Sequence, residues 1–166
     1  NEAFRLDNID LLVNCAGISH FGAFMQTTPE TITELLTVNT LAPMLFVQHF
    51  IARIKQISPY SHHTIINVGS TFGAIGYPGF TSYCASKFAL KGFTEALARE
   101  LSDSKIRIAY FAPRATKTDI NSSIVDDLND SLGNSVDDPK FVAEEFMVLL
   151  NSKKSRKSVG WPEKLF

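Results

Sequence analysis

The sequence predicts an α/β fold in which helices cover a parallel β-sheet. Short apolar runs alternate along the chain with longer segments in which apolar residues recur every three or four positions. Consecutive apolar residues are typical of strands buried on both faces, and strands that alternate with helices pair in parallel. The chain has 166 residues, of which 45% are hydrophobic and 20% charged, so we expect one ordinary folded domain.

Four apolar runs are expected to form the strands. They cover residues 10–17, 64–68 and 107–112, with the start of a last strand at 158–160. In a parallel sheet the carboxyl ends of the strands lie at one edge, where ligands bind. We therefore expect function in the loops that follow Val13, Val68 and Phe111.

The segments between these runs are expected to be helical. Thr28 and Pro29 are typical of an N-cap and a first helical position. Helical patterns follow over residues 41–57, with a break, over 83–102, and over 139–150 after the cap Asp138. The polar segment 121–137 predicts a mobile loop with at most one helical turn, and 153–157 predicts a solvated basic turn.

Composition excludes several classes of function. Sixteen basic and seventeen acidic residues leave a formal charge of −1, which offers no electrostatic footprint for nucleic acid or an anionic membrane. The longest apolar stretch, 41–54, is interrupted by polar residues and predicts no transmembrane segment. Cys15 and Cys84 are expected to be buried, reduced thiols of a cytoplasmic protein. The four histidines and two cysteines lack the spacing of a metal site.

Three residues carry the strongest chemical pattern. Tyr83 and Lys87 are four apart at the start of the long helix, so they share one face. An ammonium beside a phenol favours the phenolate and lowers the phenol pKa. Ser70 leaves a buried strand thirteen residues earlier, where its hydroxyl could donate to a substrate carbonyl while Tyr83 delivers the proton. The structural alternatives are a surface Tyr, a solvated Lys and a turn-forming Ser.

Asn39 adds a fourth point because Pro43 follows it within a helical pattern. Proline has no N–H, so the carbonyl of Asn39 loses its helical partner and the helix is expected to kink. An unpaired carbonyl at depth must find water or a side chain, which could hold a relay water near Lys87. An ordinary kinked core helix is the alternative.

Together these motifs resemble the short-chain dehydrogenase/reductase family. The family's motifs are matched, in its order and at its spacings, by residues 14–17, Asn39, Ser70, 83–87 and 113–118. The similarity covers essentially the whole chain. The resemblance implies a doubly wound, Rossmann-like α/β fold with NAD(P) across the strand ends, and residues 1–166 would form the C-terminal portion of that single domain.

The resemblance also implies a catalytic tetrad of Asn39, Ser70, Tyr83 and Lys87. In those roles Tyr83 is the general acid/base and Ser70 positions the carbonyl. Lys87 holds the nicotinamide ribose and lowers the pKa of Tyr83, and Asn39 holds the relay water. Hydride would pass between the nicotinamide and the carbonyl carbon.

Further family matches are expected to contact the cofactor. These residues are Asn14, Ala16, Gly17, Tyr83, Lys87, Pro113, Thr116 and Thr118. Cys15 replaces an Asn of the family turn at a position expected to be buried, Arg114 stands where Gly is usual, and Thr116 stands where Val is usual. Arg114 could reach a phosphate or an acidic substrate, or be an exposed charge at a strand end.

The family's Gly-rich pyrophosphate turn does not occur before Asp10. The strand over 10–17, patterned for the middle of a sheet, would then lie at its edge. We expect the sequence to be an excerpt of a longer product that, as it stands, binds dinucleotide weakly.

The expected function is an oxidoreductase that transfers a hydride between NAD(P) and a small-molecule carbonyl or alcohol. Carbonyl reduction is favoured, with NADPH slightly ahead of NADH. Ile124, Val125 and Leu128 indicate an apolar substrate. The alternative is a catalytically inactive, truncated remnant that acts through a partner or as an interaction module.

A homodimer or homotetramer is expected through the helix over 39–57 and the helix that begins at Tyr83. A stripe of small residues on the latter would let another element approach closely. It consists of Ala85, Ala89, Gly92 and Ala96. Contact with the chain's own sheet would use the stripe equally well.

Overall fold

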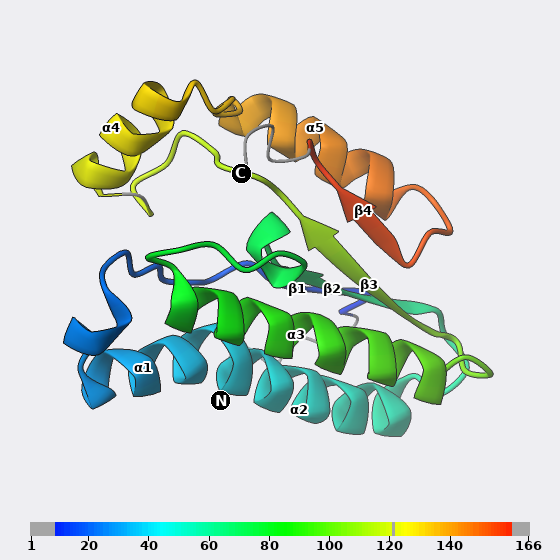
Figure 1. Ribbon diagram of the computed structural model, residues 1–166. Coiled ribbons are helices and arrows are strands. Elements are labelled where there is room, and N and C mark those ends of the chain that lie inside the picture. The colour runs from blue at the N-terminus through cyan, green and yellow to red at the C-terminus, as the bar shows by residue number, and fades with distance from the viewer. Residues whose placement is uncertain (1–8, 121, 161–166) are drawn as a thin grey trace.

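The computed structural model of the chain describes residues 9–120 and 122–160 (Figure 1). A four-stranded parallel sheet lies between two layers of helices, in the strand order β1-β2-β3-β4. The strands are β1 (Leu11–Asn14), β2 (His63–Val68), β3 (Ile106–Ala112) and β4 (Arg156–Ser158). The predicted α/β fold with a parallel sheet is therefore confirmed.

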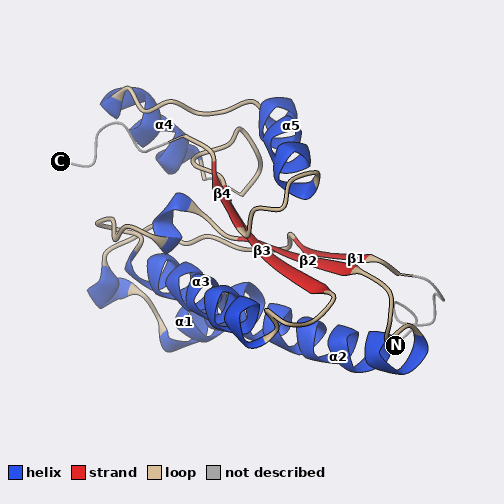
Figure 2. Ribbon diagram, turned by 90° about the vertical axis from the view of Figure 1, so that its right-hand side faces the viewer, coloured by secondary structure: helices blue, strands red, loops and turns tan. Residues whose placement is uncertain are grey.

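The helices divide between the two faces of the sheet (Figure 2). One layer holds α1 (Pro29–Leu36), a π-helical turn (Thr37–Leu41), α2 (Ala42–Ile57) and α3 (Thr81–Glu100). The other layer holds α4 (Ser123–Leu132) and α5 (Pro139–Leu150). Helices on both faces are what the doubly wound arrangement requires.

The inner strands are apolar at consecutive positions because their side chains fill two cores in turn. Ile65 and Ile108 pack with residues of α2 and α3. Their neighbours Ile66 and Ala109 pack against Leu149 of α5 on the other face. A strand buried on both faces needs this continuous apolar pattern.

The predicted helix starts are confirmed at two caps. The Thr28 hydroxyl accepts a hydrogen bond from the amide of Thr31 at 3.2 Å, and the Asp138 carboxylate accepts one from the amide of Lys140 at 2.8 Å. Each side chain satisfies an amide that the first helical turn leaves without a partner.

The break expected before Pro43 is a π-helical turn, so the helical chain runs without interruption from Pro29 to Ile57. A π-helical turn contains one residue more than an α-helical turn, and such turns within α-helices are frequent near functional sites. By length and composition alone this joined stretch could cross a membrane, unlike the shorter stretch that the sequence indicated. In the structure Val47, Phe50 and Ile54 of this stretch are core residues against the sheet.

The segment 121–137 was expected to be a loop, and that expectation is wrong for most of it. Residues Ser123–Leu132 form the ten-residue helix α4, which ends at Gly133 in the left-handed region (φ 62°). The helix forms because Val125 and Asn129, four residues apart, share one buried face.

Two other expectations need correction. Arg156 and Lys157 belong to β4 rather than to a solvated turn, and Lys157 is stabilised there by an ion pair with Glu145 at 2.8 Å. Cys84 is buried as expected, but Cys15 is exposed. The reason is that β1 is an outer strand of the described sheet, with Leu11 and Val13 more than a third exposed.

Gly69 tests the packing beneath the site. A Cβ built at Gly69 would lie 1.9 Å from the hydroxyl oxygen of the buried Tyr110, which has no room to move. We expect Gly69→Ala to lower the free energy of unfolding by about 2 kcal/mol, because overpacking forces neighbouring groups apart. Gly76→Ala is the control, since a Cβ there meets nothing within 4 Å. Equal urea midpoints for the two variants would contradict this packing.

Candidate active site

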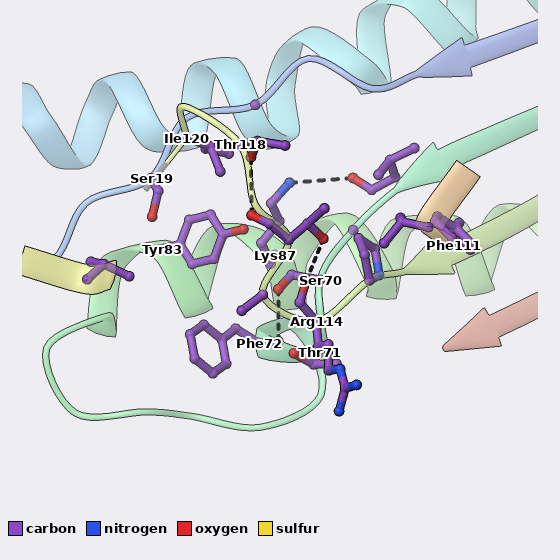
Figure 3. A pocket seen from close by; sticks show the side chains of 18 of the residues that line it. Ser19, Ser70, Thr71, Phe72, Tyr83, Lys87, Phe111, Arg114, Thr118 and Ile120 are labelled. Atoms are coloured by element: carbon purple, nitrogen blue, oxygen red, sulfur yellow. Dashed lines mark hydrogen bonds between the residues drawn. The ribbon is translucent and has the colours of Figure 1, made fainter. Parts of the chain in front are cut away.

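A cavity of about 490 Å³ opens at the carboxyl ends of β1, β2 and β3 (Figure 3). Its walls include Ser70 from the loop after β2, Tyr83 and Lys87 from α3, and Thr118 from the segment after β3. These are the loops in which the strand pattern predicted function. Register explains the convergence, because Asn14 pairs with Asn67 and Val68 with Phe111, so the three strands end side by side.

Tyr83 and Lys87 lie one turn apart on the inner face of α3, and both are buried. The Lys87 Nζ atom is 5.7 Å from the centroid of the Tyr83 ring and donates to the carbonyl oxygen of Val68 at 3.4 Å. A Cβ at Gly17 would lie 3.3 Å from the same nitrogen. Three elements therefore converge on one ammonium group.

Burial shifts both pKa values away from the ionised forms. It raises the pKa of the Tyr83 phenol to about 12, although a hydrogen bond with the Ser70 side chain opposes the rise. It lowers the pKa of the Lys87 ammonium to about 8. Loss of solvation is the largest cause of the rise for Tyr83, and the lowering of its pKa by Lys87 stays a prediction.

Ser70 lies directly before a short 3-10 turn (Thr71–Gly73) that follows β2. Its hydroxyl oxygen accepts a hydrogen bond from the amide of Phe72 at 3.1 Å. The buried hydroxyl of Tyr110 lies beneath it, accepting from the Ser70 amide at 3.3 Å and donating to the Ser70 carbonyl at 3.4 Å. Sequence analysis missed Tyr110, although a phenol within a buried strand always needs such a partner.

Asn39 is completely buried, and both atoms of its side-chain amide are paired. The oxygen accepts from the amide of Ile18 at 2.9 Å. The nitrogen donates to the carbonyl of Ile18 at 2.9 Å and to the hydroxyl of Ser86 at 3.0 Å. The side chain therefore fastens the loop after β1 to α3 next to Lys87, and Ser86 is a second residue that sequence analysis missed.

The residues predicted to contact a cofactor divide into two groups. Gly17, Pro113, Thr116 and Thr118 line the cavity together with Tyr83 and Lys87. Asn14 and Ala16 are not among the lining residues. Asn14 instead donates to the side chain of Asn67 at 2.8 Å, and Asn67 donates to Thr94 of α3 at 2.9 Å. This buried chain of hydrogen bonds joins two strands to a helix.

Arg114 is neither an exposed charge nor a free ligand for phosphate. Its Nε and Nη2 atoms donate to the two carboxylate oxygens of Asp137 at 2.9 and 2.8 Å. The amide of Asp137 also donates to the carbonyl of Ala115 at 2.9 Å. A bidentate pair of this kind is specific in geometry. It fastens the start of the segment that carries α4 to its end.

Comparison with known proteins gives one consistent result. The model of the family described as short chain dehydrogenase matches residues 2–129. Carbonyl reductase family member 4 of Xenopus laevis is 35% identical over 150 residues, which are 89% of this chain and 62% of that protein. The 3-oxoacyl-[acyl-carrier-protein] reductase of Bos taurus is 36% identical over 128 residues, 77% of this chain and 51% of that protein.

Solved structures agree in fold. A short-chain dehydrogenase from Sphingobium yanoikuyae in complex with NADPH superposes with a TM-score of 0.81 at 28% identity, over 95% of this chain and 60% of that chain. The 3-ketoacyl-(acyl-carrier-protein) reductase of Brucella melitensis complexed with NADH gives 0.79 at 27% identity, over 92% and 66%. The chain thus spans about half to two-thirds of the proteins that it matches.

Burial of the Lys87 ammonium should lower the free energy of unfolding. Its pKa is lowered from 10.5 to about 8, so the unfolded chain binds the proton more tightly and burying the ammonium is unfavourable below pH 8. We expect Lys87→Met to raise the free energy of unfolding at pH 7 by on the order of 3 kcal/mol. That gain should shrink as the pH rises from 8 to 10.5 and then vanish, since the wild-type side chain is neutral in both states.

Lys91→Met on the same helix is the matched control, because Lys91 is more exposed and pairs with Glu95 at 3.9 Å. It should change stability by less than about 0.5 kcal/mol. Urea denaturation across this pH range measures both variants. A loss of stability at pH 7 in Lys87→Met would contradict the account of this burial.

Proposed function

The chain belongs to the short-chain dehydrogenase family, and we propose that it carries the catalytic portion of an NAD(P)-dependent oxidoreductase. The reaction is hydride transfer between the nicotinamide and the carbon of a carbonyl or alcohol. One observation carries the proposal: Ser70, Tyr83 and Lys87 line the same cavity at the strand ends, where hydrogen bonds hold the Ser70 hydroxyl and the Lys87 ammonium.

The residues around Lys87 fit a nicotinamide nucleotide. An ammonium has three protons to donate, and a ribose offers hydroxyl groups to receive them. Gly17 leaves space beside the nitrogen that a side chain would fill, since a Cβ there would lie 3.3 Å away. Pro113, Thr116 and Thr118 line the neighbouring wall and would hold the nicotinamide end. When bound, the nicotinamide supplies or accepts the hydride.

The chain's own residues handle the proton. The Ser70 oxygen already accepts from the amide of Phe72, so its own proton is left to bond a substrate carbonyl oxygen. Tyr83 donates its phenolic proton to the same oxygen during reduction and takes it back during oxidation. The Lys87 ammonium stabilises the tyrosinate that results. Beside them, the Asn39 carbonyl has no amide donor four residues on, because that residue is Pro43, and it would hold a relay water.

The proposed proton transfer depends on positive charge near Tyr83, because that charge lowers the pKa of the phenol. The Tyr83 phenol alone, with a pKa of about 12, is too weak an acid for rapid exchange at neutral pH. Lys87 and an oxidised nicotinamide ring would together bring the pKa down. This account applies equally to NAD and NADP, and we retain a slight preference for NADPH.

A non-enzymatic alternative rests on β1. Leu11 and Val13 on this outer strand are more than a third exposed, so a remnant that acts through a partner would dock there. Nicotinamide nucleotide binding distinguishes the two proposals, since a remnant has no need for it.

We place the protein in the cytoplasm as a homodimer or homotetramer. The small-residue stripe supports assembly, because Ala85, Ala89, Gly92 and Ala96 are all exposed rather than packed on the chain's own sheet. Phe88 lies between them and is 43% exposed. The neighbouring helix α2, which runs beside α3 in both views, presents Leu45 at 45% exposure (Figures 1 and 2). A second copy would cover this face.

Tyr83→Phe is the direct test of catalysis. The variant keeps the ring but has no proton to donate, so we expect kcat to fall at least about 10³-fold with NADPH and a ketone. The Kd for NADPH should change less than about two-fold, because the phenol oxygen adds little to cofactor affinity. Tyr60→Phe, at an 84% exposed tyrosine, is the control. Near-normal turnover in Tyr83→Phe would refute the assignment.

Phe88→Glu tests the assembly. A carboxylate buried between two copies of α3 would lose its hydration, so the variant should dissociate to single chains by light scattering. Phe141→Glu is the matched control, since Phe141 is equally exposed on α5 in the opposite layer. If the wild type is already monomeric, or if Phe88→Glu leaves its mass unchanged, this face is not the interface.

A further inference from the structure

One wall of the cavity is built from aromatic rings. Phe72 stacks on Tyr77 with ring centroids 5.4 Å apart, and Phe80 lies 5.0 Å from Phe72. Both Phe72 and Phe80 present edge-to-face contacts to Tyr83, at 6.3 and 6.0 Å. We call Phe72, Tyr77 and Phe80 the aromatic wall; all three line the cavity beside the proposed proton donor.

The aromatic wall is held in place from behind. Phe21, from the loop after β1, packs against Phe80 with centroids 5.0 Å apart. Gly79 has φ +80°, and a Cβ there would come within 2.3 Å of the Phe21 ring. The amide of Gly22 donates to the carbonyl of Gly79 at 2.9 Å, which ties the two loops together. A wall supported in this way offers a preformed surface to a ligand.

The side of the cavity formed by α4 and the segments next to it combines apolar side chains with the amides of Asn129 and Asn134. Ile120, Val125 and Leu128 line it, and Figure 3 shows Ile120 and Phe72 on opposite sides of the Tyr83 ring. A group that binds against the Tyr83 ring can leave water for apolar surface on both the Ile120 and the Phe72 side. Apolar contact of this kind favours a flat or ring-shaped group over a short chain.

Positive charge is scarce where this group would bind. Among the described residues that line the cavity, Lys87 and Arg114 are the cations. Arg114 is already neutralised by the two oxygens of Asp137, whose side chain is 8% exposed. Lys87 is assigned to the nucleotide by the proposed function. A carboxylate or phosphate on the substrate would therefore lose its water without gaining a partner.

We infer that the cavity takes an uncharged ketone, or its alcohol, that carries a ring-sized apolar group. The carbonyl would lie at Ser70 and Tyr83, and the ring would lie between the aromatic wall and α4. The reaction in this statement and the assignment of Lys87 to the nucleotide rest on the proposed function, whereas the aromatic wall and the pairing of Arg114 with Asp137 are features of the cavity itself.

Binding tests the inference independently of turnover. The probe is 4′-fluoroacetophenone, observed by fluorine NMR with the full-length protein, with and without NADPH. Acetophenone and 4-acetylbenzoate compete for the probe; they share the ring and the ketone and differ in one carboxylate. We expect acetophenone to displace the probe at a concentration at least about ten-fold lower than 4-acetylbenzoate does.

Two variants test whether the probe and its charged competitor bind in this cavity. Tyr77→Ser removes a ring of the aromatic wall and should weaken binding of the probe about five-fold, whereas Tyr60→Ser, far from the cavity at 84% exposure, should not. Asp137→Asn removes the negative charge that neutralises Arg114. It should improve binding of 4-acetylbenzoate relative to acetophenone, because the Asp137 carboxylate no longer cancels the positive charge of Arg114.

The outcomes separate the two proposals. Equal affinity for the two competitors, or no binding of the probe, would overturn the inference in the unmodified protein. Equal loss of binding in Tyr77→Ser and Tyr60→Ser would overturn it as well. Selective binding of acetophenone without its reduction by NADPH or NADH would uphold the cavity's preference and refute the proposed function.

Discussion

The site depends on one costly burial, that of the Lys87 ammonium. Within the described part of the chain its nitrogen donates a long hydrogen bond to the Val68 carbonyl, beside the Tyr83 ring and next to Gly17. Loss of solvation lowers the pKa of Lys87 toward neutral pH and raises that of Tyr83 away from it, so Tyr83 needs a nearby positive charge before it can ionise. Proteins accept such a loss of stability where function requires it.

The surrounding structure offsets that cost by fixing each neighbour through buried, fully used polar groups. Asn39 fastens the loop after β1 to α3, and the hydroxyl of Ser86 that it binds donates in turn to the carbonyl of Tyr83 at 2.7 Å. Tyr110 supports the Ser70 loop from below in the same manner. Buried polar networks whose members are all paired make an arrangement rigid and specific. Under the proposed function, proton transfer from Tyr83 to a carbonyl oxygen held by Ser70 would need that rigidity.

Much of this arrangement can be predicted from sequence patterns, and the features that could not be predicted have identifiable physical reasons. The strands, the caps at Thr28 and Asp138 and the convergence of the strand ends follow from periodicity and local chemistry. Helix α4 was not predicted because most of its residues are polar and only a narrow face, Val125 and Asn129, is buried. The partners of Arg114 and Tyr110 are 23 and 40 residues distant in sequence, so no local pattern indicates them. The pKa of Tyr83 depends on burial, which a helical spacing from Lys87 cannot reveal.

The central claim is that the Tyr83–Lys87 pair becomes an effective acid/base only when positive charge is present, or forms, on a nicotinamide ring beside it. The ultraviolet absorbance of tyrosinate measures it, recorded as the difference between wild type and Tyr83→Phe in a pH titration with and without NADP⁺. The account predicts that Tyr83 ionises near pH 12 alone. With the oxidised nucleotide bound, it predicts ionisation at least about two units lower, because a cationic ring favours the phenolate. An unchanged titration on saturation with NADP⁺ would contradict it.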